Sequence, residues 1–218
     1  MASKATKVPS QISHYPPIQT RIFTTMMSAN RFKDVANQVL RTNPNRTNKS
    51  QLKTFVGKFG TTPDVAAELW LAMNPVAKLH PKSEPKHLLW ALLFLFHYDT
   101  ESNNCAIVGI NDEKTFRKWC WIFVAGIVSL EKHVIRWENR FINYNGTAKC
   151  LVLIDGTDCH VNEPYPFDTT TMFSQKFKGS GYKYEVAVAI RCDKICNIVG
   201  PEKAGVSDKL LQNYVTVD

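Results

Sequence analysis

Acidic side chains follow a short apolar run in the segment LVLIDGTDCH, residues 151–160. Leu151 to Ile154 form the run, which predicts a buried β-strand. Asp155 follows directly, and Asp158 lies three residues later. A carboxylate at the end of a buried strand needs a basic partner, backbone N–H groups or a metal ion, because an unpaired buried charge is costly. The alternative is an Asp-Gly turn in which the Asp155 side chain caps its own backbone.

A second acidic position, Asp208 in AGVSDKLL, follows a segment long enough to form two further strands. Two converging carboxylates, Asp155 and Asp208, would form an oxygen-ligand site suited to Mg²⁺ or Mn²⁺. Such ions stabilise the attacking and leaving oxygens in phosphodiester cleavage. The alternative is that Ser207 or Asp208 caps a last helix, and this role is compatible with catalysis.

Two other kinds of site are weaker alternatives. Cys192, Cys196, Cys159 and His160 could supply four zinc ligands, but neither pair has a strong zinc-site spacing. A pair of carboxylates could also belong to a glycosidase. The basic net charge and the absence of aromatic residues that could form a sugar platform around these acids disfavour that class.

The composition predicts a folded chain with an acidic partner. The chain has 218 residues, of which 44% are hydrophobic, so it can bury a substantial core. The formal net charge of +8 and the pI near 9.2 favour nucleic acid, and we expect duplex DNA. No stretch approaches roughly 18 uninterrupted apolar residues, so we expect no membrane span. The six scattered cysteines predict reduced thiols rather than a disulfide framework.

Helical periodicity and capping residues recur before residue 142. The predicted helices cover residues 31–41, 52–60, 63–73, 87–98, 112–130 and 133–141. Gly60 suits the end of the second helix, and Thr62 with Pro63 suits the start of the third. Residues 74–85 contain three prolines and predict a loop. A polar connection after the apolar 87–98 helix leads to Asn111, which could cap the next helix.

The helix after Asn111 carries basic residues in its first half. Lys114, Arg117 and Lys118 there suit a helix-turn-helix module, since residues at the start of a recognition helix reach DNA bases. Basic residues on a solvated helix face are the alternative. The apolar positions of this helix are expected in the core rather than against bases: Phe116, Trp119, Trp121 and Phe123.

Strand-forming residues dominate after residue 150. Residues 151–155, 182–192 and 194–200 are rich in β-branched and aromatic residues and predict strands. Between them, Lys176 and Lys178 lie in a basic, glycine-containing bend. This bend could contact DNA phosphates, or it could simply be an exposed hairpin loop.

Helices followed by strands indicate an α+β or α/β chain with two parts. Residues 1–30 are rich in Ser, Thr and Pro and predict a disordered basic arm. Residues 31–141 form the helical, helix-turn-helix-like region expected to bind DNA. Residues 150–218 hold three strands and one helix start, so this sheet domain is expected to be incomplete.

An ordered set of motifs resembles the PIF/Harbinger-type DDE transposase family. The set comprises DGTD (155–158) with EPYPF, FSQKFKGSGYKYEVAVAIR (173–191) and GPEKAGVSD (200–208). Upstream, FVGKFGTTPDVAAELW, HLLWALLFLFHYDTE and DEKTFRKWCWIF resemble the helical region before the catalytic domain of that family. The likeness covers roughly residues 31–218.

The resemblance implies an RNase H-like mixed-sheet core in which three acidic residues bind two divalent metals. Asp155 matches the first acid and Asp208 the second. Nothing between Lys209 and Asp218 matches the third, so the chain is expected to be a C-terminally truncated fragment. Asp158 occupies a position that varies in the family and is expected beside the site rather than on the metal.

The implied activity of the full-length family is metal-dependent hydrolysis and strand transfer of DNA phosphodiesters. The alternative is a non-catalytic DNA-binding protein from a domesticated or degenerate transposon copy. Either function predicts a nuclear location, with a mitochondrial leader in the basic N-terminus as the alternative. A second copy of the chain or an accessory DNA-binding protein would be a further partner.

Overall fold

The computed structural model describes most of the chain between residues 28 and 205. The described residues are 28–77, 79–146, 150–161 and 170–205. The expected basic arm lies outside them except for its last residues, 28–30, of which Ala29 and Asn30 already belong to the first helix. Asp208 also lies outside the described residues.

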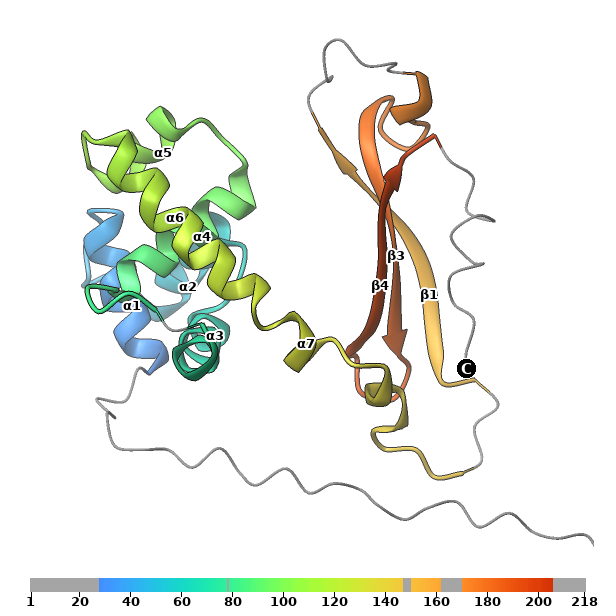
Figure 1. The fold of residues 1–218 in the computed structure, drawn as a ribbon. Coiled ribbons are helices and arrows are strands. Elements are labelled where there is room, and N and C mark those ends of the chain that lie inside the picture. The colour runs from blue at the N-terminus through green and yellow to red at the C-terminus, as the bar shows by residue number, and fades with distance from the viewer. Residues whose placement is uncertain (1–27, 78, 147–149, 162–169, 206–218) are drawn as a thin grey trace, which may run out of the picture. The chain divides into compact units, whose positions relative to one another are not determined.

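The chain divides into two compact units (Figure 1). The helical unit comprises the described residues of 1–71 and 82–120, and the sheet unit those of 72–81 and 121–218. The division falls within two helices, whereas the sequence suggested a change of domain between residues 141 and 150.

The helices fall in the first two thirds of the chain. They are α1 (Ala29–Val39), α2 (Asn48–Phe59), α3 (Pro63–Val76), α4 (Pro85–His97), α5 (Glu101–Val108), α6 (Glu113–Val128) and α7 (Glu131–Val134), with 3₁₀ turns η1 (Trp137–Phe141) and η2 (Thr170–Met172). None of the described helices combines the length and apolar character needed to cross a membrane.

Local capping sets the boundary between α2 and α3 as predicted. Gly60 follows α2 with a φ of 67°, which glycine tolerates best, and its N–H donates to the Val56 carbonyl. The Thr62 hydroxyl accepts from the Val65 N–H at 3.3 Å, and Pro63 opens α3. The predicted loop at 74–85 begins too early, since α3 continues through Pro75 in its last turn.

The core of the helical unit is apolar and centred on α4. Leu88, Leu89 and Leu93 of α4 are fully buried, which confirms the prediction of a central buried helix. Aromatic residues from three other helices are buried as well: Phe32, Phe55, Phe59 and Phe116. The Phe55 and Phe59 rings meet edge to face with centroids 4.8 Å apart.

Helix α5 replaces the polar connection that the sequence predicted. The Thr100 hydroxyl caps it by accepting from the Asn103 N–H at 3.2 Å. The fully buried Asn104 donates to the carbonyls of Asp99 and Thr100. Because polar contacts fix this helix and few of its residues are apolar, hydrophobic periodicity did not reveal it.

The sheet is antiparallel throughout the described residues. Its strands are β1 (Val152–His160), β2 (Phe173–Ser174), β3 (Gly179–Ala189) and β4 (Ile195–Lys203). The long strand β3 pairs with β1, β2 and β4. Helices and an antiparallel sheet make the chain α+β in class, and three of the four strands were predicted.

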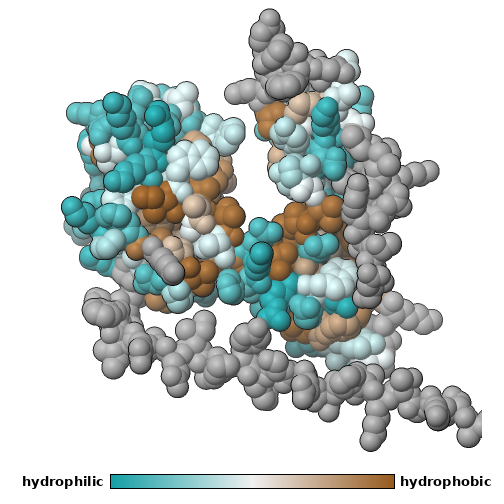
Figure 2. All heavy atoms as spheres, in the orientation of Figure 1, coloured by the Kyte–Doolittle hydropathy of each residue, from teal (hydrophilic) through white to brown (hydrophobic). Residues whose placement is uncertain are grey.

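The two faces of the sheet differ in burial. One face holds a small apolar cluster in which Ala187, Ala189 and Cys196 pack with Trp137 and Val152. On the other face large hydrophobic side chains are exposed, among them Leu153 and Ile198. Hydrophobic surface (brown) is visible in Figure 2 on both units.

Candidate functional site

Asp155 lies in the middle of β1 rather than at its end. It is exposed, pairs with Val186 of β3, and its Oδ1 accepts from the Gly156 N–H at 2.9 Å. The strand continues to His160, so the predictions of a strand end and of an Asp-Gly turn are both wrong. The cause is non-local, because β3 supplies pairing partners for every residue from Val152 to His160.

Asp155 and Asp158 lie on opposite faces of β1, since side chains alternate along a strand. The Ser174 hydroxyl donates to Asp158 Oδ2. Asp158 Oδ1 is buried and has no hydrogen-bond partner among the described residues. A metal site shared by Asp155 and Asp208 remains a prediction, because Asp208 lies outside the described residues.

A row of charged residues crosses the face of the sheet that carries Asp158. Strand pairing places Lys183 of β3 opposite Asp158, and Glu202 of β4 opposite Lys183. Glu185 is two residues farther along β3 on the same face and is opposite Gly156. Sequence reasoning missed this row, although the period-two spacing of Lys183 and Glu185 with Ala187 places them on one face.

The glycine-containing bend between β2 and β3 is a hairpin turn, as the sequence predicted. Lys176 Nζ donates to the Gly156 carbonyl at 2.6 Å, and Lys178 Nζ to Gln175 Oε1 at 2.9 Å. Lys178 has a φ of 57°, in the left-handed region that tight turns use. Both ammonium groups therefore have local partners, and their contact with DNA remains a prediction.

The zinc alternative finds no support in the sheet. Cys159 pairs with Tyr182 near the start of β3, whereas Cys192 follows the other end of that strand. The residues that the structure describes contain no group of three or more His, Cys, Asp or Glu side chains placed to hold a metal ion. All six cysteines lie in the described residues and are free thiols, as predicted.

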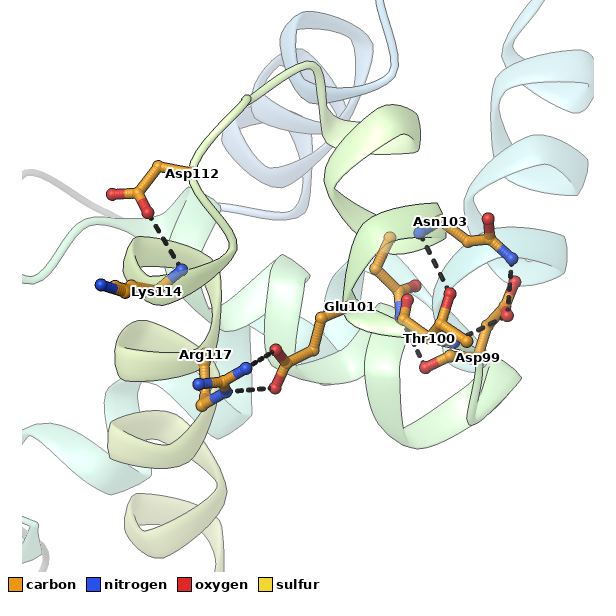
Figure 3. Close-up of polar contacts among 8 residues, drawn as sticks. Asp99, Thr100, Glu101, Asn103, Asp112, Lys114 and Arg117 are labelled. Carbon is orange, nitrogen blue, oxygen red and sulfur yellow. Dashed lines mark hydrogen bonds and ion pairs between the residues drawn. The ribbon is translucent and has the colours of Figure 1, made fainter.

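A helix-turn-helix connects α5 to α6. Gly109, with a φ of 72°, ends α5, and α6 begins after a turn closed by Asp112. Asp112 Oδ1 accepts from the Lys114 N–H at 3.0 Å (Figure 3). Asp112, rather than the expected Asn111, therefore caps α6.

Arg117 forms an ion pair that ties α6 to α5 (Figure 3). Its Nε donates to Glu101 Oε1 at 2.6 Å, and its second nitrogen donates to Glu101 Oε2. Hydrogen bonding to Arg117 lowers the pKa of the Glu101 carboxyl, and the same contact raises the pKa of the Arg117 guanidinium. One of the three expected DNA contacts thus has a structural partner.

The outward face of α6 carries Lys114, Lys118 and Trp121 at helical spacing. Trp121 is 55% exposed, so its predicted place in the core is wrong, whereas Phe116 and Phe123 are buried as predicted. Acidic residues offset the lysines in this part of the chain. Residues 99–120 contain four acidic and three basic residues.

The α1–α2 segment has a much larger excess of basic residues. Residues 28–61 contain seven basic residues and one acidic residue, Asp34. Arg31, Lys49 and Lys53 are exposed, and Lys33 Nζ joins the two helices by donating to Asn48 Oδ1 at 3.0 Å. No ion pair between these basic residues and a carboxylate occurs within the described part of the chain.

The likeness of the chain to known proteins is confined to its motifs. No protein-family model, curated protein or solved structure matches the chain. The family resemblance therefore rests on the order of the sequence motifs alone. The charges and contacts of the described residues are the other basis for assigning a function.

Proposed function

We propose that the chain binds duplex DNA through its helical unit. The observation that carries the proposal is the excess of six positive charges in residues 28–61, none of them paired with a carboxylate among the described residues. DNA phosphates release condensed counterions when such cations approach, which favours binding. The resemblance to DDE transposases points to the same partner.

The two basic regions have different proposed roles. Arg31, Lys49 and Lys53 would contact backbone phosphates, which fix a protein on the duplex without reading its sequence. Lys114 and Lys118, at the start of the second helix of the helix-turn-helix, would approach bases. Arg117 would position α6 through Glu101 rather than touch DNA.

Salt dependence of binding tests the proposal. Fluorescence anisotropy with a short random duplex should show affinity that falls steeply with salt. Replacing Arg31, Lys49 and Lys53 together by alanine should reduce the slope by about 0.9 for each phosphate that is no longer neutralised. Lys132→Ala in α7 is a matched control that should leave the slope unchanged. Absence of salt-dependent binding by the unmodified chain would refute the proposal.

A second candidate function is metal-dependent cleavage of DNA phosphodiesters by an RNase H-like domain. It is favoured by the exposed position of Asp155 on β1, where the resemblance assigns the first metal ligand. Mg²⁺ or Mn²⁺ would be held by Asp155 and Asp208 and would stabilise the attacking and leaving oxygens. The third acid that the family requires has no match in the chain.

We therefore expect no Mg²⁺- or Mn²⁺-dependent nicking of plasmid DNA above background. An ion that lacks its anchoring carboxylate is poorly fixed and stabilises the transition state little. The comparison is with Asp155→Ala, and cleavage that disappears in this variant would establish the nuclease. The expected nuclear location and a partnership with a second copy or an accessory DNA-binding protein remain predictions.

A further inference from the structure

Two carboxylates on one face of the sheet have oxygen atoms without partners. Glu185 is only 5% exposed, and its Oε2 is buried with no hydrogen-bond partner among the described residues. The same holds for Asp158 Oδ1. Asp158 is opposite Lys183, so Glu185 is its diagonal neighbour across β1 and β3. Diagonal neighbours lie about 7–8 Å apart, which is within reach of long side chains.

This arrangement lacks sufficient positive charge for its acids. Lys183, 8% exposed, lies between Asp158 and Glu202 in the row and can neutralise only one carboxylate. A buried carboxylate oxygen without a donor or a cation loses its hydration without replacement. A fold keeps such a group only when something compensates it, and a bound cation is one of the few possibilities.

We infer that Asp158 and Glu185 together bind one divalent cation of the Mg²⁺ or Mn²⁺ class. Mg²⁺ is commonly held by one or two carboxylates while water completes its shell, so two protein ligands suffice. Gly156 stands opposite Glu185 and has no side chain, so β1 leaves that position uncovered. Lys183 would lie beside the ion, where an ammonium group could orient a phosphate oxygen.

The inferred ion differs from the one that the family resemblance implies. Asp155 is on the other face of β1, so its carboxylate cannot join Asp158 and Glu185 around one ion. The new site uses only residues that the structure describes. It stands independently of DNA binding by the helical unit.

Titration of the whole chain with Mn²⁺ tests the inference, with free Mn²⁺ followed by electron paramagnetic resonance. The unmodified chain should bind one ion saturably, and Mn²⁺ should raise its Tm. Glu185→Gln and Asp158→Asn each keep the side-chain shape and should weaken binding at least 10-fold. Asp193→Asn, in the exposed turn after β3, is the matched control and should bind normally.

Three results would overturn the inference. The first is the absence of saturable Mn²⁺ binding by the unmodified chain, which would mean that Lys183 alone compensates the acids. The second is normal binding by both Glu185→Gln and Asp158→Asn. The third is loss of the ion in Asp155→Asn but not in Glu185→Gln, which would favour the Asp155 site. Circular dichroism of each variant without metal establishes that it is folded.

Discussion

The helical unit and the sheet unit differ in what they bury. The buried polar residues of the helical unit are neutral or neutralised by burial, namely Asn37, His87 and Asn104. The sheet unit buries two charged residues, Lys183 and Glu185, on a single strand. Apolar burial stabilises folding, whereas burial of charge opposes it unless partners compensate. The helical unit is thus organised for stability, and the polar face of the sheet is the better candidate for a ligand.

The largest predicted effect tests the apolar half of this comparison. Phe116→Ala removes a fully buried ring beside Trp90 and should lower the free energy of unfolding by about 3–5 kcal/mol. Urea denaturation followed by circular dichroism at 222 nm measures the change. Leu52→Ala, at an exposed position of α2, is the control and should change stability little. Equal effects of the two variants would contradict the assigned core.

The next prediction concerns pH and the buried imidazole of the helical unit. Burial, with a smaller contribution from Lys86, lowers the pKa of His87 to about 4 from its ordinary 6.5. Its ring stacks on Trp119 with centroids 3.9 Å apart, and its Nδ1 accepts from the Glu84 N–H. The unfolded chain therefore binds a proton first as the pH falls. Stability from this group is complete above pH 6.5 and is lost between 6.5 and 4, by at most about 3 kcal/mol.

His87→Asn isolates this effect, because the amide oxygen can accept the same hydrogen bond without titrating in this range. Urea midpoints of the variant should depend less on pH between 6.5 and 4 than those of the unmodified chain. Carboxyl groups titrate in both chains, so only the difference between the two profiles reports on His87. Parallel profiles would show that the imidazole is protonated as readily in the fold as in the unfolded chain.

A smaller effect tests the charged half of the comparison. Lys183→Met keeps the length of the side chain but removes positive charge beside Asp158 and Glu185. Without added metal it should destabilise the sheet unit by about 1–3 kcal/mol, the usual cost of leaving buried polar groups uncompensated. Thermal unfolding is the measurement, and Lys194→Met in the exposed turn before β4 is the control. Stabilisation by Lys183→Met would mean that the face does not need the cation.

The smallest predicted effect is at the Arg117–Glu101 pair. Both side chains are largely in solvent contact, where salt screens such pairs. Arg117→Gln should therefore lower Tm less than the three changes above, and a double-mutant cycle with Glu101→Gln should give a small coupling. DNA binding by Arg117→Gln should keep its salt slope. A slope that falls as much as in Lys114→Ala/Lys118→Ala would place Arg117 on a phosphate.

Several features of the fold follow from short-range sequence signals. Gly60 and Thr62 mark the boundary between α2 and α3, because caps involve residues within one helical turn. The β-branched and aromatic run at 182–192 predicted β3 for the same local reason. The excess of Lys and Arg over Asp and Glu is a property of composition, so the preference for an acidic partner follows from the sequence alone.

Only the tertiary structure decided where the chemically important groups lie. Asp155 is in mid-strand because β3 extends its ladder past Gly156, and this pairing joins residues far apart in the sequence. The same register places Asp158, Lys183 and Glu185 on one buried face. Arg117 meets Glu101 only because the turn at Gly109 folds α6 back on α5. Caps and propensities act over a few residues, whereas register and ion pairing depend on contacts that no local pattern encodes.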